Sequence, residues 1–426
     1  MLLAKIQKMY LSILKEELIL ATGCTEPIAI AYAAAELRDI LGKKPEKIRA
    51  EVSGNIIKNV KSVIVPNTGG LKGISAAIAA GIIGGDASKV LQVISSIPEN
   101  LHGQIASYVQ NAPIEIVCAD TPRLLDICLT GWTDGHYARV HIANNHSNIV
   151  LKEKDGDVII EKEISNSAED SLTDKSVLNV KDILEFANTV DICEVEPLLK
   201  PQISCNLAIA EEGLKNNWGA NIGSVLLKEY PQGIKTEAKA WAAAGSDARM
   251  SGCELPVVIL SGSGNQGITA SVPVIRYAMN LGVSQEMLYR ALVVSDLVTI
   301  HQKSGIGRLS AYCGAVSAGV GAGAGIAYLL DGGYEAIAHT IVNAVAIISG
   351  TICDGAKPSC AAKIAASVEA GILGYNMYRN NQEFKGGDGI VTKGVENTIA
   401  NIGILAQEGM KQTDRTILSI MTEKYI

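Results

Sequence analysis

The residues in this sequence with the clearest chemical potential are cysteines, and three of the nine stand in distinctive surroundings. Cys313 lies in GRLSAYCGAVSAG, while Cys353 and Cys360 lie in TICDGAKPSCAAK. On an unbroken helix the last two would have Cα atoms about 10.5 Å apart, too far to share one small inorganic cluster. Gly355 and Pro358 separate them, so we expect a loop between two helix ends that could bring both sulfurs to one cluster. Cys313 precedes a Gly/Ala-rich helix, which permits the close approach of a third thiolate.

Spacing alone leaves a second interpretation open, in which all three are small core residues, as free cysteines often are. The pattern lacks the tight paired spacings and the fourth ligand of a zinc site. The cysteine count is odd, and charges interrupt the apolar stretch at the start of the chain, unlike a signal peptide. We therefore expect reduced thiols and a cytoplasmic location.

Cys24, in ATGCTEP, is a further residue of interest. It precedes Pro27, which suits the first position of a helix. A thiol at that point feels the positive end of the helix dipole, which favours the thiolate. The alternative is a small buried residue packed against the helix end.

Two polar segments could hold an anionic group. The segment 260–273, LSGSGNQGITASVP, offers backbone amides together with Asn265 and Gln266, although a plain turn between helices has the same composition. It is not a nucleotide-binding P-loop. Lys303 and Arg308 lie just before Cys313 and could bind a carboxylate, or be solvated surface charges.

The elements that must position these residues fall into two kinds. Between residues 45 and 169 the pattern is mixed, and Asp155-Gly156 is a strong hairpin signal between two strand-like runs. The expected strands cover 48–53, 113–119, 123–131, 136–144, 148–154 and 158–164, and the expected helices cover 71–85 and 89–97.

The rest of the chain is predicted to be helical. Residues 3–20 and 27–41 have helical spacing of apolar side chains, and the polar run 165–176 is the clearest linker. Beyond it we expect helix, turn and helix with no strand pair. We therefore predict an α+β fold with a discontinuous helical domain (1–44 and 170–426) and an inserted α+β domain (45–169).

The composition of the chain indicates which classes of partner it is expected to bind. The net charge is −7 and no basic run occurs, so no nucleic-acid partner is expected. Two uncharged stretches, 309–330 and 336–353, are long enough to span a bilayer but are rich in glycine or contain His339 and Asn343. We predict buried helices and no membrane association. The glycine-rich helix faces favour a homodimer.

Taken together and in this order, GCTEP, SGSGNQG, GRLSAYCG and CDGAKPSC resemble the L-cysteine desulfidase family, which is related to the α-chain of iron–sulfur L-serine dehydratase. The resemblance extends over nearly the whole chain. It implies a helical catalytic domain with a [4Fe–4S] cluster and an α+β domain similar to the allosteric substrate-binding module of serine dehydratases. It also implies a lyase of amino-acid catabolism, without pyridoxal phosphate, that converts L-cysteine to hydrogen sulfide, pyruvate and ammonia.

The resemblance also implies roles for individual residues. Cys313, Cys353 and Cys360 match the cluster ligands, and Cys24 matches a catalytic cysteine. The substrate-binding candidates are Thr25, Glu26, Asn265, Gln266, Lys303, Arg308 and Lys357.

Two features depart from the dehydratase pattern. The gap between Cys353 and Cys360 is shorter, and the chain ends in Ile426 where a dehydratase can end in a cysteine that reaches the cluster. Cys24 could therefore be the base or an occasional fourth ligand. Two other functions stay open: a serine dehydratase-type deaminase acting on a related β-substituted amino acid, and a non-catalytic cluster-based sensor of amino acids or redox state.

Overall fold

The computed structural model describes residues 2–164, 172–307 and 310–422. Its helices are α1 (Ala4–Glu17), α2 (Thr25–Leu41), α3 (Gly54–Val60), α4 (Gly73–Gly84), α5 (His102–Asn111), α6 (Val180–Thr189), α7 (Ile192–Lys215), α8 (Ile222–Glu229), α9 (Ile234–Met250), α10 (Gly264–Leu281), α11 (Gln285–Ile306), α12 (Gly314–Leu330), α13 (Tyr334–Ile348), α14 (Cys360–Arg379), α15 (Val395–Ile404) and α16 (Lys411–Thr422). Shorter turns are the 3₁₀ helices η1 (Ala87–Gln92), η2 (Glu99–Leu101) and η3 (Lys175–Val177) and the π-helix η4 (Leu405–Gly409). The strands are β1 (Ile19–Thr22), β2 (Lys47–Val52), β3 (Ile114–Cys118), β4 (Asp126–Thr133), β5 (His136–Ala143), β6 (Ile149–Lys154), β7 (Asp157–Glu161) and β8 (Pro256–Ile259).

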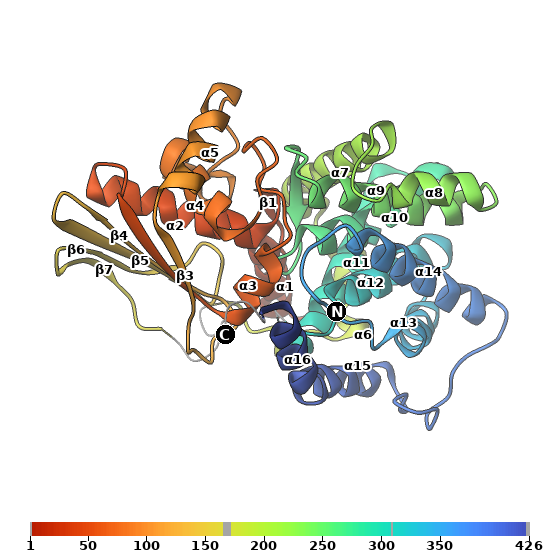
Figure 1. The fold of residues 1–426 in the computed structure, drawn as a ribbon. Helices are drawn as coiled ribbons and strands as arrows, with labels where there is room; N and C mark the ends of the chain where they lie inside the picture. Colours follow the sequence, from red (N-terminus) through yellow and green to blue (C-terminus); the bar gives the residue numbers. More distant parts are fainter. Residues whose placement is uncertain (1, 165–171, 308–309, 423–426) are drawn as a thin grey trace.

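The predicted α+β fold class is confirmed. Figure 1 shows a sheet-containing unit beside a helical unit, with α16 near the junction. The sheet has the order β3-β2-β4-β5-β6-β7, in which β2 and β3 are parallel and the other neighbours are antiparallel. Asp155 and Gly156 both adopt positive φ in the turn between β6 and β7, as the predicted hairpin requires.

The helical unit is built around α12, which packs against α10, α11, α13 and α14. Its glycines permit this close packing, since a Cβ on Gly321 would lie 2.1 Å from Thr299 Oγ1 and one on Gly319 would lie 2.5 Å from the Ser367 backbone. The buried helices predicted within 309–330 and 336–353 are confirmed as α12 and α13, although residues 349–353 lie beyond the end of α13. The glycine faces therefore pack within the chain, and the homodimer stays a prediction.

Three local predictions are wrong. Residues 89–97 do not form a helix, because Val90 has a non-helical φ of 48° and breaks the 3₁₀ turn η1. The first helix ends at Glu17, and residues 19–22 form β1 instead. The region after residue 170 also contains a strand, β8, where no strand pairing was expected. It pairs antiparallel with β1, from Ile19 opposite Ile259 to Thr22 opposite Pro256.

The second helix has the predicted end, since Gly42 adopts the left-handed conformation at its C-terminus. Its packing, however, differs from the predicted assignment to the helical unit. The helix α2 packs against α4 and against β4 and β5 of the six-stranded sheet. Its contacts therefore associate it with the α+β unit, and the domain boundaries stay a prediction. Among the helices of the described residues, none combines the length and apolar character needed to cross a membrane.

A cysteine-lined cavity as the candidate active site

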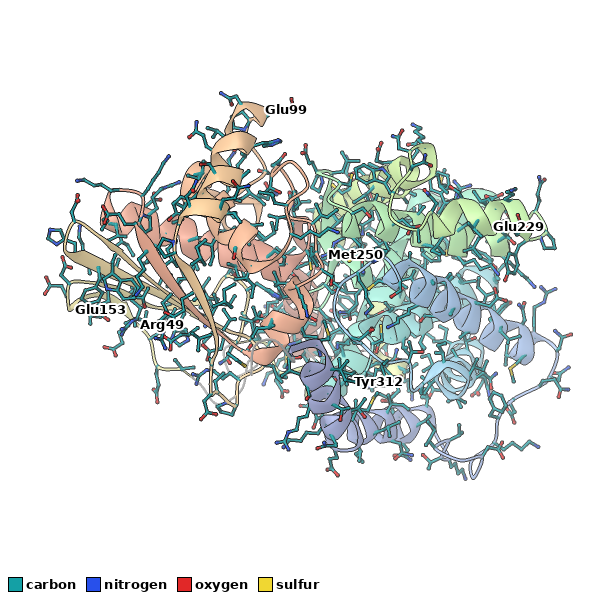
Figure 2. The ribbon with its side chains drawn as sticks, in the orientation of Figure 1. Arg49, Glu99, Glu153, Glu229, Met250 and Tyr312 are labelled. Atoms are coloured by element: carbon teal, nitrogen blue, oxygen red, sulfur yellow. The ribbon has the colours of Figure 1, made fainter. Side chains whose placement is uncertain are left out.

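A cavity of about 490 Å³ lies where the two units meet, and the four sequence motifs line it. Figure 2 labels Met250 and Tyr312, which lie in this central region, next in sequence to the cavity residues Arg249 and Cys313. The helices α2, α10, α12 and α14 all begin at the cavity. Their N-termini carry unpaired amides and positive partial charge, so they favour thiolates and other anions in the cavity.

The missed strand pair explains how two of the motifs meet. The strand β1 leads directly to Cys24, and β8 leads directly to the loop before α10. Because the two strands pair, the segments that follow them lie side by side. Thr25 Oγ1 donates to the carbonyl oxygen of Gly262 at 2.9 Å. Cys24 and Gln266 thereby reach the same cavity.

A second short pairing brings Cys313 and Cys353 together. Tyr312 and Ile352 form an isolated antiparallel bridge. Cys313 immediately precedes α12, and Cys353 lies in the loop between α13 and α14, as predicted. The two buried thiols lie close enough to shift each other's pKa. The interaction with Cys353 raises the pKa of Cys313, and the interaction with Cys313 lowers the pKa of Cys353.

Cys360 is the third thiol of the group. It is the first residue of α14, lines the same cavity and interacts electrostatically with Cys313 and Cys353. Burial raises the pKa of its thiol. All three sulfurs are free thiols. Among the described residues no three His, Cys, Asp or Glu side chains surround a single point as ligands of one metal ion.

Cys24 differs from its prediction in one respect. It does stand immediately before the first turn of α2, but it is buried, and its Sγ donates to Glu26 Oε2 at 3.2 Å. Burial, followed by the nearby Glu26 carboxylate, raises the pKa of Cys24 well above its ordinary value. The predicted resting thiolate is therefore wrong, because these two effects outweigh the helix dipole.

Glu26 has a closely defined position. Its Oε1 accepts from Asn59 Nδ2 at 3.0 Å, and its Oε2 accepts from Thr25 Oγ1 at 3.1 Å as well as from Cys24. Glu26 lines the cavity, whereas Thr25 is not part of the cavity wall. Thr25 therefore orients Glu26 and the loop at Gly262, and direct binding of substrate by Thr25 stays a prediction.

The other predicted binding residues divide by location. Asn265, Gln266 and Lys303 line the cavity, and Lys303 is only 4% exposed. Lys357 does not line it, because its ammonium group is bound to the side chain and carbonyl of Asp354. Substrate binding by Lys357 therefore stays a prediction. Arg308 lies outside the described residues.

Several buried polar residues of the cavity are not among the predicted site residues, and they include Lys58, Asn59 and Arg249. Lys58 binds Asp414 of α16, which ties the α+β unit to the last helix. The available signal was a charged residue inside an apolar run, as in GNIIKNV for Lys58 and in AAAGSDARM for Arg249. Residues such as Arg123 and Asn144 of the α+β unit also line the cavity, so both units form it.

Comparison with known proteins identifies the family. The model of the serine dehydratase alpha chain family matches residues 139–419, and this chain belongs to that family. Relatives named UPF0597 protein match almost end to end: one from Desulfitobacterium hafniense is 59% identical over 97% of this chain and 96% of its own. Others are 50% identical in Lachnoclostridium phytofermentans, over 97% and 99% of the two chains, and 48% identical in Treponema denticola, over 97% of each. The resemblance to serine dehydratases is thus confirmed.

Proposed function

We propose that this protein is a [4Fe–4S]-dependent lyase that eliminates hydrogen sulfide from L-cysteine to give pyruvate and ammonia. The observation that carries the proposal is the gathering of Cys313, Cys353 and Cys360 on the wall of one cavity that also contains the Cys24–Glu26 pair. Membership of the serine dehydratase alpha chain family supports an elimination reaction on a small amino acid.

The donor set fits an iron–sulfur cluster. Such clusters are held by cysteine thiolates, and three free thiols meet here beside the N-termini of α12 and α14. A cluster differs from a single ion because each thiolate binds a separate iron, so its ligands need not surround one point. When bound, the cluster supplies a Lewis-acidic iron that stabilises the leaving sulfur or oxygen of the substrate.

The proton chemistry falls to Cys24 and Glu26. The Cα proton of an amino acid is weakly acidic, so its removal needs a base held at the correct place. The Cys24 thiol proton already points to Glu26 Oε2, and transfer along that hydrogen bond leaves a thiolate beside a neutral carboxyl group. The thiolate then accepts the Cα proton. Asn59 and Thr25 keep Glu26 oriented for the first transfer.

Gln266 is placed to recognise the substrate ammonium group. It is 4% exposed, lines the cavity, and its Oε1 has no hydrogen-bond partner among the described residues. A buried carbonyl oxygen without a partner is costly, and an ammonium donor would satisfy it. Gly314 makes room for this side chain, because a Cβ there would lie 2.6 Å from Gln266 Cδ.

The test is an anaerobic assay of sulfide and pyruvate release from L-cysteine, with Cys24→Ala as the inactive variant and Cys253→Ala as a control. Cys253 is a buried cysteine outside the cavity. The proposal predicts equal amounts of sulfide and pyruvate from the wild type and the control. Unchanged turnover in Cys24→Ala would contradict the assigned role.

Dehydration of L-serine is the second candidate, and the description of the family favours it. The same cavity residues would act on a hydroxyl leaving group in place of a thiol. Pyruvate measured with L-serine and L-cysteine under identical conditions distinguishes the two, because the true substrate has the higher kcat/KM.

A further inference from the structure

We propose that Arg249 and the N-terminus of α10 form the subsite that binds the α-carboxylate of the substrate. The inference deepens the proposed function and rests on it for the identity of the ligand as an amino acid. Arg249 is the penultimate residue of α9 and lines the cavity.

The first argument is that the buried charge of Arg249 has no counter-ion within the part of the chain that the structure describes. Its side chain is 2% exposed, and no carboxylate of the described residues forms an ion pair with it. Burying a guanidinium group is expensive unless an anion accompanies it. Arg49 and Arg276, by contrast, pair with Glu51 and Glu237 respectively.

The second argument is that the guanidinium group of Arg249 still has N–H donors available for a ligand. Its Nη1 donates to Asn265 Oδ1 at 3.1 Å, which fixes the plane of the group against the start of α10. Its Nε is buried and has no partner among the described residues. An arginine fork with open donors matches the two oxygens of a carboxylate.

The third argument is the backbone beside Arg249. The helix α10 begins at Gly264, and Ser263 before it provides no side-chain hydrogen bond to cap the first turn. The amides of that turn have no intrahelical acceptor, and a carboxylate would supply one. A Cβ on Gly264 would lie 2.3 Å from Arg249 Nε, so glycine is required for the guanidinium group to reach this helix end.

The placement also suits the chemistry. Arg249 is close enough to Cys24 to lower the pKa of its thiol electrostatically, and Gln266 lies in the first turn of α10. A carboxylate on Arg249 and an ammonium group on Gln266 would hold Cα near Cys24. The subsite is therefore specific for α-amino acids with a free carboxylate.

The experiment measures binding, without turnover, by calorimetry on anaerobically purified protein. L-alanine, which has no leaving group, is compared with L-alaninamide, which replaces the carboxylate by a neutral amide. We expect the wild type to prefer L-alanine by roughly tenfold or more, the effect of one charge-assisted hydrogen-bond pair. Arg249→Met should abolish this preference, and Arg249→Lys should retain part of it because the charge remains.

The matched control is Arg276→Met, which removes an arginine of the helical unit that pairs with Glu237. It should keep the wild-type preference. A preference that survives in both Arg249 variants overturns the proposal, as does a wild type that binds the two ligands equally. Should Arg249→Met not fold, Arg249→Lys and Gly264→Ala carry the test.

The subsite and the proposed lyase activity can fail separately. A wild type that binds L-alanine through Arg249 but releases neither sulfide nor water from any amino acid supports the subsite and contradicts the lyase. A wild type that releases sulfide with the same KM as Arg249→Lys and Arg249→Met contradicts the subsite and leaves the lyase in place.

Discussion

Cys313 and Cys353 are positioned by their own backbones. The Cys313 amide donates to the carbonyl oxygen of Thr351 at 3.0 Å, and the Cys353 amide donates to that of Ala311 at 2.6 Å. These bonds flank the bridge between Tyr312 and Ile352 and do not involve either thiol. The conformation of these two segments therefore depends on backbone hydrogen bonds and not on the thiol groups.

This dependence predicts that the thiols can be removed without unfolding the protein. Cys313→Ala and Cys353→Ala should each change the free energy of unfolding of the cluster-free protein by less than about 1 kcal/mol, because the backbone bonds persist. Denaturant titration measures this. Cys253→Ala, a substitution in the core, serves as the comparison and should be at least as destabilising. Global unfolding of Cys353→Ala alone would show that the thiol itself holds the loop.

Gly355 is predicted to be essential for the loop that carries Cys353. It has φ of +93°, and a Cβ on it would lie 2.3 Å from the backbone oxygen of Lys58. Gly355→Ala should displace the loop and sharply reduce iron binding in anaerobic reconstitution. Gly350→Ala is the matched control, since Gly350 has φ of +103° in the same loop with nothing within 4 Å of the added Cβ. It should cost about 1 kcal/mol of stability from backbone strain alone and retain iron. Equal iron content in the two variants would contradict the prediction.

Glu26→Gln is predicted to disable turnover and spare the cluster. The glutamine retains the size of the side chain but cannot accept the Cys24 proton. We expect kcat to fall by about 10²–10⁴-fold, the usual contribution of a positioned base. The kcat of Cys24→Ala should fall by at least the same factor, and this variant should keep the visible absorption of the cluster. Loss of that absorption in Cys24→Ala would reassign Cys24 as a fourth ligand.

Asp296 should make stability depend on pH. It is fully buried in α11, Gln202 Nε2 donates to its Oδ1 at 2.9 Å, and burial raises its pKa to about 7. Its unfolded pKa is about 3.9, so the folded state holds the proton more tightly. The contribution of Asp296 to stability is complete below about pH 4 and declines until the pH passes about 7.

Asp296→Asn removes this titration. The free energy of unfolding of the variant should therefore fall less between pH 5 and pH 8 than that of the wild type. Exposed Asp157 on β7 provides the control, and Asp157→Asn should follow the wild-type curve. Parallel curves for Asp296→Asn and the wild type would refute the prediction.

Local patterns in the sequence predicted much of the fold. The hairpin at Asp155-Gly156, the end of α2 at Gly42 and the loop between Cys353 and Cys360 all follow from residues that are neighbours in sequence. The pairing of β1 with β8 could not be predicted in this way. Each strand is four residues long, and its partner lies in a distant part of the chain.

The candidate site shows the same division. Motif order placed Cys24, Gln266 and the three clustered cysteines in one region, and the structure brings them to one cavity. Arg249 and Lys58 were missed because a single charge in an apolar run resembles a helix-surface residue until its burial is known. The protonation of Cys24 was mispredicted for a related reason: the hydrogen bond to Glu26 and the burial of both residues depend on tertiary packing.

The iron and acid-labile sulfide content of anaerobically purified protein tests the central proposal most directly. We predict about four irons and four sulfides per chain, brown colour that bleaches in air, and loss of both elements in Cys313→Ala, Cys353→Ala and Cys360→Ala but not in Cys253→Ala. Wild-type protein that takes up no iron and sulfide during anaerobic reconstitution, or ligand variants that bind as much as the wild type, would contradict it.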